Sequence, residues 1–248
     1  MNTSPGVCGV FEVIRAIKLC VLTIYSFIRH RLLVIKWAHH ADNRSFGWDW
    51  KSINFNRIAV VNLLLSNYKN PKYLEIGCST NILFDSVPTM NKIGVDPVAG
   101  GTERMTSDEF FFKNKTQFDV IFIDGLHTYA QARTDVVNAI KCLNRDGWIV
   151  LHDMLPQNWI EHHVPSVSNS AWTGDVWKVA FELLQTEGIE FKIVKIDFGV
   201  GVARVSKNNV ELTDLTSKLA SEEFNYYYDN IVSLPIVEWQ EAQQWILS

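Results

Sequence analysis

The sequence predicts an α/β fold in which a parallel sheet is covered by helices. After Pro71, short apolar runs alternate with amphipathic stretches, the order typical of parallel strands joined by crossover helices. Strands are expected at residues 72–76, 92–96, 118–124, 148–153, 191–196 and 200–205. With 248 residues, 47% of them hydrophobic, the chain is long enough to bury one sizeable core.

Helices are expected before and between these strands. The clearest one covers residues 129–143, where apolar side chains share one face and Asp146-Gly147 is expected to form the turn that ends it. Shorter helices are predicted at residues 57–66 and near 175–187. These elements place the main domain at residues 57–205, followed by an aromatic C-terminal extension at 206–248.

Residues 1–56 are predicted to form an N-terminal helical arm and an aromatic linker. The pattern over residues 10–37 is helical, contains no Gly or Pro, and places Arg15, Lys18, Arg29 and Lys36 on one stripe. Residues 1–45 carry six cationic and two acidic side chains, whereas the whole chain has a net charge of −4. Two interpretations stay open. The helix packs on its own domain or on a second copy of the chain, or it lies on an anionic membrane surface.

Composition excludes several classes of protein. The negative net charge and a pI near 6.0 give no attraction to phosphate backbones, so nucleic acid is not expected as a partner. The four cysteines form no CxxC pair, which is typical of a reducing compartment. The longest uncharged stretch of the predicted helix, residues 19–28, is about half the length of a membrane-spanning helix. A cytoplasmic protein is therefore expected, either free or associated with a membrane surface.

Polar residues follow four of the predicted strands, at the sheet edge where open α/β folds bind ligands. Gly77 allows a tight turn after the first strand, so that the following amides can face a ligand. Asp96 stands 19 residues further on, close to the spacing at which an acid accepts hydrogen bonds from a ribose. A turn or cap acid is an equal alternative for Asp96. The other two strand ends carry Asp124 with His127, and His152-Asp153.

Five segments, in their order and spacing, resemble the class I S-adenosylmethionine-dependent methyltransferases: YLEIGC, GVDP, GGTERMTSDEFF, FDVIFIDGLHTYAQARTDV and GWIVLHDMLP. They look most like the branch often found in surface-polysaccharide and natural-product pathways, and the resemblance spans residues 73–178. It implies a Rossmann-like sheet with flanking helices, and S-adenosylmethionine as the cofactor. The loop after the first strand holds a single glycine, which argues against a dinucleotide-binding dehydrogenase.

The resemblance also implies the roles of individual residues toward the cofactor. Glu75 and Gly77 would lie beside the methionine moiety, Asp96 would hold the ribose hydroxyls, and Ser107-Asp108 would border the adenine. Carboxylates suit a cationic sulfonium, an ammonium group and the adenine amine. The full predicted set is Glu75, Gly77, Cys78, Ser79, Asp96, Ser107, Asp108 and Asp124.

The resemblance extends to metal-dependent O-methyltransferases of the catechol and macrocin types. It implies metal ligands at Asp124, His152 and Asp153, and a catalytic base at His127. A histidine among the ligands makes Mn²⁺, Fe²⁺ and Zn²⁺ candidates beside Mg²⁺. Without a metal, His152 and Asp153 would form a pair that fixes the loop. An imidazole with a pKa near 6.5 can accept an alcohol proton at neutral pH without any metal.

The sequence thus predicts an S-adenosylmethionine-dependent O-methyltransferase that acts on a hydroxyl of a sugar or sugar-containing metabolite. Its catalytic residues would be His127 and Asp124, and its partners a small-molecule or glycan acceptor and, as an option, a second copy of the chain. Two alternatives remain: a metal-dependent hydroxylase on the same fold, and a non-catalytic binding module. Candidates for an aromatic wall of the acceptor site are Trp159, Trp172 and Trp177, and a surface loop is expected at His162 and His163.

Overall fold

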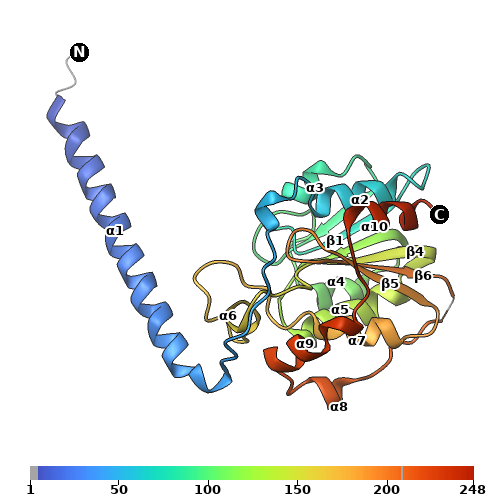
Figure 1. Cartoon of the computed structure of the whole chain (residues 1–248). Helices are drawn as coiled ribbons and strands as arrows, with labels where there is room; N and C mark the ends of the chain where they lie inside the picture. The colour runs from blue at the N-terminus through green and yellow to red at the C-terminus, as the bar shows by residue number, and fades with distance from the viewer. Residues whose placement is uncertain (1–4, 208) are drawn as a thin grey trace.

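A computed structural model of the chain describes residues 5–207 and 209–248, and only the backbone of residues 5–14, 16 and 23. Its centre is a seven-stranded sheet with the order β2-β1-β3-β4-β6-β5-β7 (Figure 1). The strands are β1 (Tyr73–Ile76), β2 (Lys92–Val95), β3 (Phe118–Ile123), β4 (Leu143–Leu151), β5 (Ile189–Val194), β6 (Val200–Val205) and β7 (Ile236–Val237). The neighbours among β1 to β4 pair in parallel, whereas β6 pairs antiparallel with both β4 and β5.

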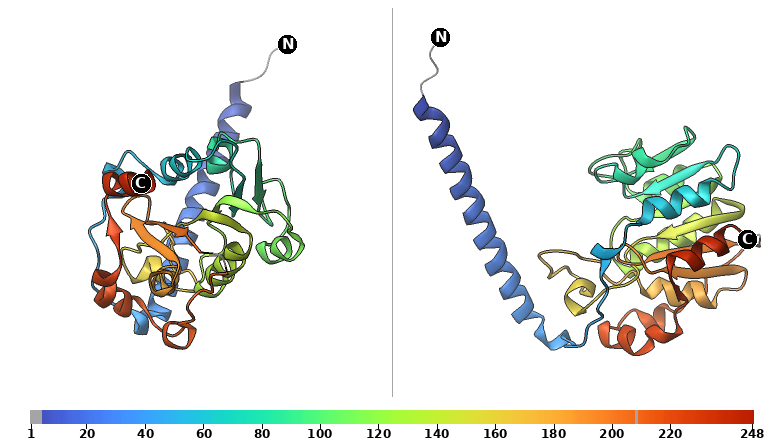
Figure 2. Two further views of the ribbon diagram at one scale, coloured as in Figure 1. Left: turned by 90° about the vertical axis from the view of Figure 1, so that its right-hand side faces the viewer. Right: turned by 45° about the horizontal axis from the view of Figure 1, so that its top comes forward.

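Helices cover both faces of the sheet (Figures 1 and 2). One face carries α2 (Arg57–Leu65), α3 (Ile82–Ser86) and α10 (Trp239–Ile246). The other carries α4 (Ser107–Lys113), α5 (Tyr129–Lys141), α7 (Lys178–Gln185), α8 (Thr216–Leu219) and α9 (Phe224–Asn230). The remaining short helices are α6 (Trp159–His162) and three 3₁₀ turns, Ala38–His40, Trp50–Ser52 and Ile231–Ser233. The predicted α/β architecture with a Rossmann-like sheet is confirmed.

The central strands are buried on both faces, which explains their nearly continuous apolar sequence. In β3, Ile121 and Ile123 pack in the core on the α5 side, while Val120 and Phe122 pack on the α2 side. Register then aligns the strand ends, since Ile123 is paired with both Ile76 of β1 and Leu151 of β4. The residues that follow β1, β2, β3 and β4 therefore meet at one edge of the sheet.

The turn expected at Asp146-Gly147 is not where α5 ends. That helix ends at Lys141, and β4 already begins at Leu143. Asp146 adopts a left-handed conformation inside β4, next to a shift in the register between β3 and β4. The sequence prediction was wrong here because a Gly-containing irregularity within a strand reads like a turn when its pairing partner is unknown.

The C-terminal residues 209–248 pack against the same sheet. β7 pairs in parallel with β5, and the Asn67 side chain donates a hydrogen bond to the carbonyl of Ile246 in α10. This segment also covers His162, one of the two histidines expected on a surface loop. His162 accepts a hydrogen bond from the Trp177 indole and contacts Glu223 through its other ring nitrogen, and His163 is equally buried. The surface prediction was wrong because the covering residues come from a distant part of the chain.

The first helix, α1 (Pro5–Lys36), projects away from the domain (Figures 1 and 2). Its C-terminal end is attached through the His30 ring, which lies 2.8 Å from the Val167 carbonyl, and through Leu33, Val34 and Trp37, which pack against the core. Within the described part of the chain, no helix combines the length and the apolar character that crossing a membrane would require.

Candidate active site

The sheet edge opens into one cavity of about 780 Å³, a size suited to a cofactor. Every site residue predicted from the sequence lines it: Glu75, Gly77, Cys78, Ser79, Asp96, Ser107, Asp108, Asp124, His127, His152 and Asp153. The structure therefore brings together all of these side chains, which arise from four strand ends and the start of α4.

The loop after β1 depends on Gly77. Its φ of +84° is one that residues with a side chain rarely adopt, and an added Cβ would lie 2.0 Å from the carbonyl oxygen of Asp124. The amide of Gly77 donates to the Val95 carbonyl, and the amide of Asp124 donates to the Ile76 carbonyl. The loop is thereby held against the ends of both neighbouring strands, and its backbone borders the cavity.

Asp96 organises two loops at the end of β2. One carboxylate oxygen accepts the amides of Cys78 and Ser79 at 3.1 and 2.9 Å, and the other accepts those of Val98 and Ala99 at 2.7 and 2.8 Å. Burial opposes ionisation, but these four hydrogen bonds outweigh it and lower the pKa of Asp96. The turn-acid role considered for this residue is therefore present, and the same carboxylate borders the cavity.

Glu75 has no cationic partner at hydrogen-bond distance among the described residues. It is 1% exposed and accepts a hydrogen bond from the Tyr73 hydroxyl at 2.6 Å. Burial raises its pKa to about 7; the Tyr73 hydrogen bond opposes this rise and the charge of Asp124 adds to it. A positive charge placed next to this carboxyl would favour its ionised form.

Ser107 and Asp108 form the first turn of α4 at the other side of the cavity. Thr106 and Glu109 form a capping box that fixes where this helix begins. The Gln131 amide donates to the Ser107 hydroxyl and to the Asp108 carboxylate, both at 3.2 Å. The helix start is therefore tied to α5, and both side chains face the cavity.

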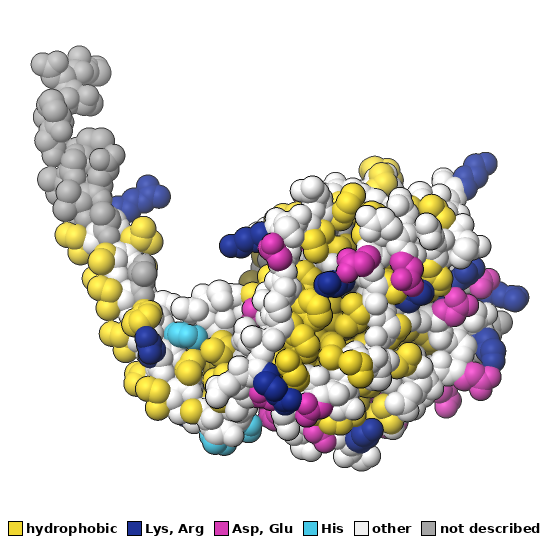
Figure 3. All heavy atoms as spheres, in the orientation of Figure 1, with side chains coloured by type: hydrophobic (Ala, Val, Ile, Leu, Met, Phe, Trp, Pro, Cys, Tyr) yellow, Lys and Arg dark blue, Asp and Glu magenta, His cyan; other side chains and the backbone are white. Residues whose placement is uncertain are grey.

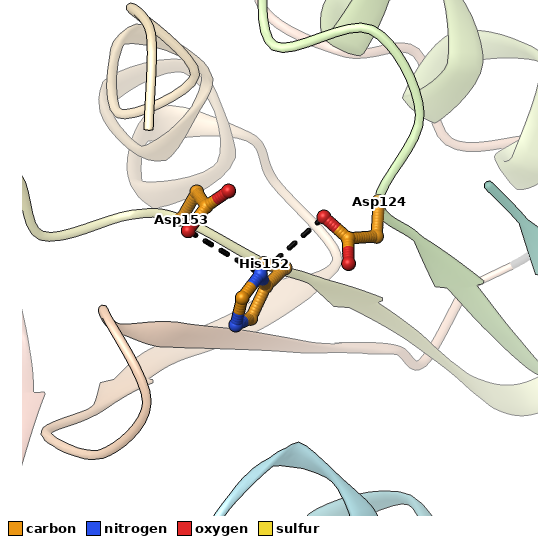
Figure 4. Close-up of side chains that lie close together, drawn as sticks. All are labelled: Asp124, His152 and Asp153. Atoms are coloured by element: carbon orange, nitrogen blue, oxygen red, sulfur yellow. Dashed lines mark ion pairs between the residues drawn. The ribbon is translucent and has the colours of Figure 1, made fainter. Parts of the chain in front are cut away.

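Asp124, His152 and Asp153 converge at the ends of β3 and β4 (Figure 4). His152 Nδ1 lies 3.3 Å from an oxygen of Asp124 and 3.3 Å from an oxygen of Asp153. Burial disfavours the imidazolium of His152, but the charges of Asp153 and Asp124 outweigh it and raise the pKa well above its usual value. Asp153 has a φ of 63°, a strained conformation that turns its carboxylate toward the other two side chains.

His127 lies beside the same two carboxylates. Its Nε2 is 3.4 Å from Asp124, while its Nδ1 is 3.1 Å from Asp153 and 2.8 Å from the carbonyl of Trp172. Burial lowers the pKa of the imidazole, but the hydrogen bond to Asp124 and the charges of Asp153 and Asp124 raise it to about 9. The ring is therefore held in a fixed orientation, and at pH 7 its charged form predominates.

The segment around Trp172 packs against the His127 ring. The Trp172 ring stacks on the imidazole with centroids 5.3 Å apart. Gly174 allows this approach, because its φ is +62° and an added Cβ would lie 1.7 Å from the His127 carbonyl oxygen. Of the three tryptophans considered for an aromatic wall, Trp159 and Trp177 are buried in the core and cannot form it, whereas Trp172 is half-buried beside His127.

Two charged residues next to the site were missed from the sequence. Arg57, at the start of α2, lines the cavity and donates to Asp197 from its side chain at 2.8 Å and from its amide at 3.1 Å. Asp197 in turn lies 3.5 Å from His152 Nε2. Asp197 belongs to the turn between β5 and β6. Because β6 runs antiparallel to β4, the start of β6 lies beside the end of β4, and this pairing was not readable from the sequence.

The cluster of Asp124, His152 and Asp153 fits a divalent cation. Two ligand atoms bound at right angles about 2.1–2.3 Å from a cation are about 3.0–3.3 Å apart, close to the 3.3 Å separations seen from His152 Nδ1. The other ring nitrogen, Nε2, is buried, has no hydrogen-bond partner in the described part of the chain, and lies 3.5 Å from Asp197. In metal sites, a ligating histidine usually donates a hydrogen bond from its other ring nitrogen to a carboxylate, a backbone carbonyl or water.

A family model matches the part of the chain that carries most of these residues. Residues 82–154 match a family model described as a methyltransferase domain, Methyltransf_24. This segment contains Asp96, Asp108, Asp124, His127 and the His152-Asp153 pair. No curated protein matches the sequence. Residues 82–154 are therefore similar to a methyltransferase domain, the class of domain that the sequence predicts.

Several solved structures are similar to the chain. Cofactor-bound Rv0187 from MTB is 14% identical, with a TM-score of 0.48 over 84% of this chain and 100% of that protein. A putative O-methyltransferase from Klebsiella pneumoniae is 14% identical, with a TM-score of 0.47 over 66% and 84% of the two chains. An O-methyltransferase from Bacillus cereus, in complex with SAH, is 12% identical, with a TM-score of 0.45 over 71% and 90%.

Proposed function

We propose that the protein transfers a methyl group from S-adenosylmethionine to a hydroxyl of a sugar or sugar-containing metabolite. The observation that carries this proposal is the placement of His127 between Asp124 and Asp153 in the cavity that Glu75, Asp96 and Asp108 also line. A methyltransferase that acts on an alcohol must remove its proton, and this imidazole is the group best placed to do so.

The cofactor is expected to lie along the carboxyl ends of β1, β2 and β3. Glu75 would pair with its cationic methionine end, next to the amides that follow Gly77 in Cys78 and Ser79. Asp96 would accept hydrogen bonds from the ribose, and the start of α4 at Ser107-Asp108 would border the adenine. This order supports a methyl group directed toward Asp124 and His127, because those residues line the same cavity beyond Glu75.

His127 would act as the general base. Its Nδ1 faces the Trp172 carbonyl, which orients the ring and leaves Nε2 as the nitrogen that can take a proton. With a pKa of about 9, only about one imidazole in a hundred is neutral at pH 7. Turnover of the metal-free protein is therefore expected to rise with pH until His127 is neutral.

Asp124, His152 and Asp153 would hold a divalent cation, with Mg²⁺, Mn²⁺, Fe²⁺ and Zn²⁺ as the candidates. Such a cation would lower the pKa of a bound hydroxyl and satisfy the carboxylates that otherwise retain the His127 proton. Asp197 would accept the Nε2 proton of His152 and keep Nδ1 free to ligate. The half-buried ring of Trp172, beside His127, would stack on a sugar acceptor.

The test measures S-adenosylhomocysteine formation with a panel of sugars and sugar nucleotides as acceptors. His127→Gln should lower turnover by about 10²–10⁴-fold and leave cofactor affinity unchanged. His39→Gln, an exposed histidine outside the cavity, is the matched control. A His127→Gln enzyme as fast as the wild type would discard the base.

Wild type is then assayed with excess chelator, followed by each of the four ions in turn. If a cation takes part, chelation should abolish activity, and Asp124→Asn and Asp153→Asn should be as damaging as the histidine change. Full activity in chelator would discard the cation. A requirement for Fe²⁺ and oxygen, without methyl transfer, would favour the hydroxylase alternative. Binding of the cofactor without turnover of any acceptor would favour a binding module.

A further inference from the structure

The described part of α1 presents an apolar face that no other part of the described chain covers. At about 100° per residue, His30, Leu33, Val34 and Trp37 point toward the domain. On the opposite side, seven apolar side chains lie within an arc of about 100°. Each is between 51% and 70% exposed: Ile17, Val21, Ile24, Tyr25, Ile28, Leu32 and Ile35. Figure 3 shows hydrophobic side chains gathered along this outer side of the helix.

The edges of this apolar arc are cationic. Lys18, Arg29 and Lys36 follow one edge, and Arg31 stands at the other. The sequence contains no acidic residue between Glu12 and Asp42. None of these four cations forms an ion pair with a described residue. The surface that covers the arc should therefore be apolar at its centre and negatively charged around it.

The spacing of the apolar residues distinguishes a flat surface from a second helix. The residues at 17, 21, 24, 28, 32 and 35 recur on average every 3.6 positions, the period of a straight helix. The apolar residues of a two-stranded coiled coil recur every 3.5 positions on average. A series with that period that begins at residue 17 would place Arg31 in the apolar contact between the two helices. Pairing of two copies would also bring their cationic edges together without any acid to compensate them.

We propose that α1 lies on an anionic lipid surface, with the arc from Ile17 to Ile35 among the acyl chains and its flanking cations at the headgroups. Long lysine and arginine side chains can extend from the edge of a buried face to the headgroup level. The arm would then hold the methyltransferase domain beside the membrane through its attachment at Val167. This proposal is independent of the acceptor and of the chemistry of the site.

Sedimentation of the full chain with vesicles tests this proposal. The vesicles are phosphatidylcholine alone, or phosphatidylcholine with 30 mol% phosphatidylglycerol. We expect binding to the anionic vesicles, weakened at least tenfold when the salt rises from 0.1 to 0.5 M, and little binding to neutral vesicles. Lack of binding to the anionic vesicles at low salt would overturn the proposal.

Variants separate the helix from general charge effects. Lys18→Gln, Arg29→Gln and Lys36→Gln together should weaken binding about 100-fold. The matched control removes three exposed lysines of the domain that form no ion pair with described residues, by Lys69→Gln, Lys115→Gln and Lys141→Gln. Equal loss of binding in both triple variants would overturn the proposal, because any cationic surface would then suffice.

The apolar arc is tested by Ile24→Ser with Ile28→Ser, which should weaken vesicle binding at least tenfold. S-adenosylmethionine affinity, measured in parallel, should be unchanged and shows that the domain is folded. Light scattering tests the competing occupant. A dimer that the two serine substitutions dissociate, in a protein that ignores anionic vesicles, would assign the arc to a second copy and overturn the proposal.

Discussion

Replacing Glu75 with glutamine should stabilise the free protein and weaken its cofactor binding. The pKa of Glu75 is raised from 4.5 to about 7, chiefly by burial. Because the pKa of Glu75 is higher in the folded state than in the unfolded state, the stability that this carboxyl contributes is fully present below about pH 4.5. That contribution is lost as the pH rises through about 7. At pH 8 the ionised, 1% exposed side chain therefore destabilises the native state.

The magnitude follows from the size of this rise. It corresponds to roughly 3 kcal/mol in the free energy of unfolding at pH 8, and to only about 0.8 kcal/mol at pH 5. Glutamine is neutral throughout and keeps an oxygen that can accept the Tyr73 hydroxyl hydrogen bond. At about 2–4 °C per kcal/mol, Glu75→Gln should melt about 6–12 °C above wild type at pH 8.

Cofactor binding should respond in the opposite direction. If S-adenosylmethionine binds the ionised form of Glu75, its affinity follows the fraction of that form in the free protein. About 90% is ionised at pH 8 and about 10% at pH 6, so wild type should bind about tenfold more weakly at pH 6. Glu75→Gln should bind more weakly than wild type at pH 8 and lose this part of the pH dependence.

Calorimetric titration and thermal unfolding of both proteins at pH 5, 6 and 8 measure these effects. Asp135→Asn is the matched control. It removes another buried carboxyl, with a pKa raised to about 6 chiefly by burial, that does not line the cavity. The control should gain stability at pH 8 and keep the tenfold difference in cofactor affinity between pH 6 and pH 8, because Glu75 is still present. Equal wild-type affinities at pH 6 and pH 8, or a Glu75→Gln variant less stable than wild type at pH 8, would refute the reasoning.

Two further substitutions test how the loops hold the site. Asp96→Asn should weaken S-adenosylmethionine binding by about 10–150-fold, the range for a hydrogen bond to a charged group, and calorimetry that finds no change would remove Asp96 from the cofactor site. Gly174→Ala places a Cβ 1.7 Å from the His127 carbonyl oxygen, so it should displace the base and reduce turnover at least tenfold while cofactor affinity is kept. Gly47→Ala, where an added Cβ meets nothing within 4 Å, is its control, and equal turnover of the two variants would show that Gly174 does not position His127.

The sequence alone located the parallel strands β1 to β3 and the polar residues after the strand ends that border the cavity. Strands buried on both faces are nearly continuous apolar runs, so their ends could be located to within a residue or two for β1, β2 and β3. Parallel strands share one carboxyl edge, and polar residues after each strand are therefore neighbours whatever their separation in the chain. For this reason the predicted set from Glu75 to Asp153 was found lining a single cavity.

Only the tertiary structure decided what surrounds that set. Asp197 reaches the site because β6 is antiparallel to β4, and nothing in the nearby sequence indicates that pairing. Arg57, from α2, is held beside it by hydrogen bonds to the Asp197 carboxylate. His162 is buried by Trp177 and Glu223, which lie 15 and 61 positions further along the chain. The raised pKa of His127 likewise depends on Asp153, from another strand. The local hydrophobic pattern of the sequence indicates where strands begin and end. Burial and charge at a site depend on contacts between distant segments of the chain, and the local pattern carries no information on those contacts.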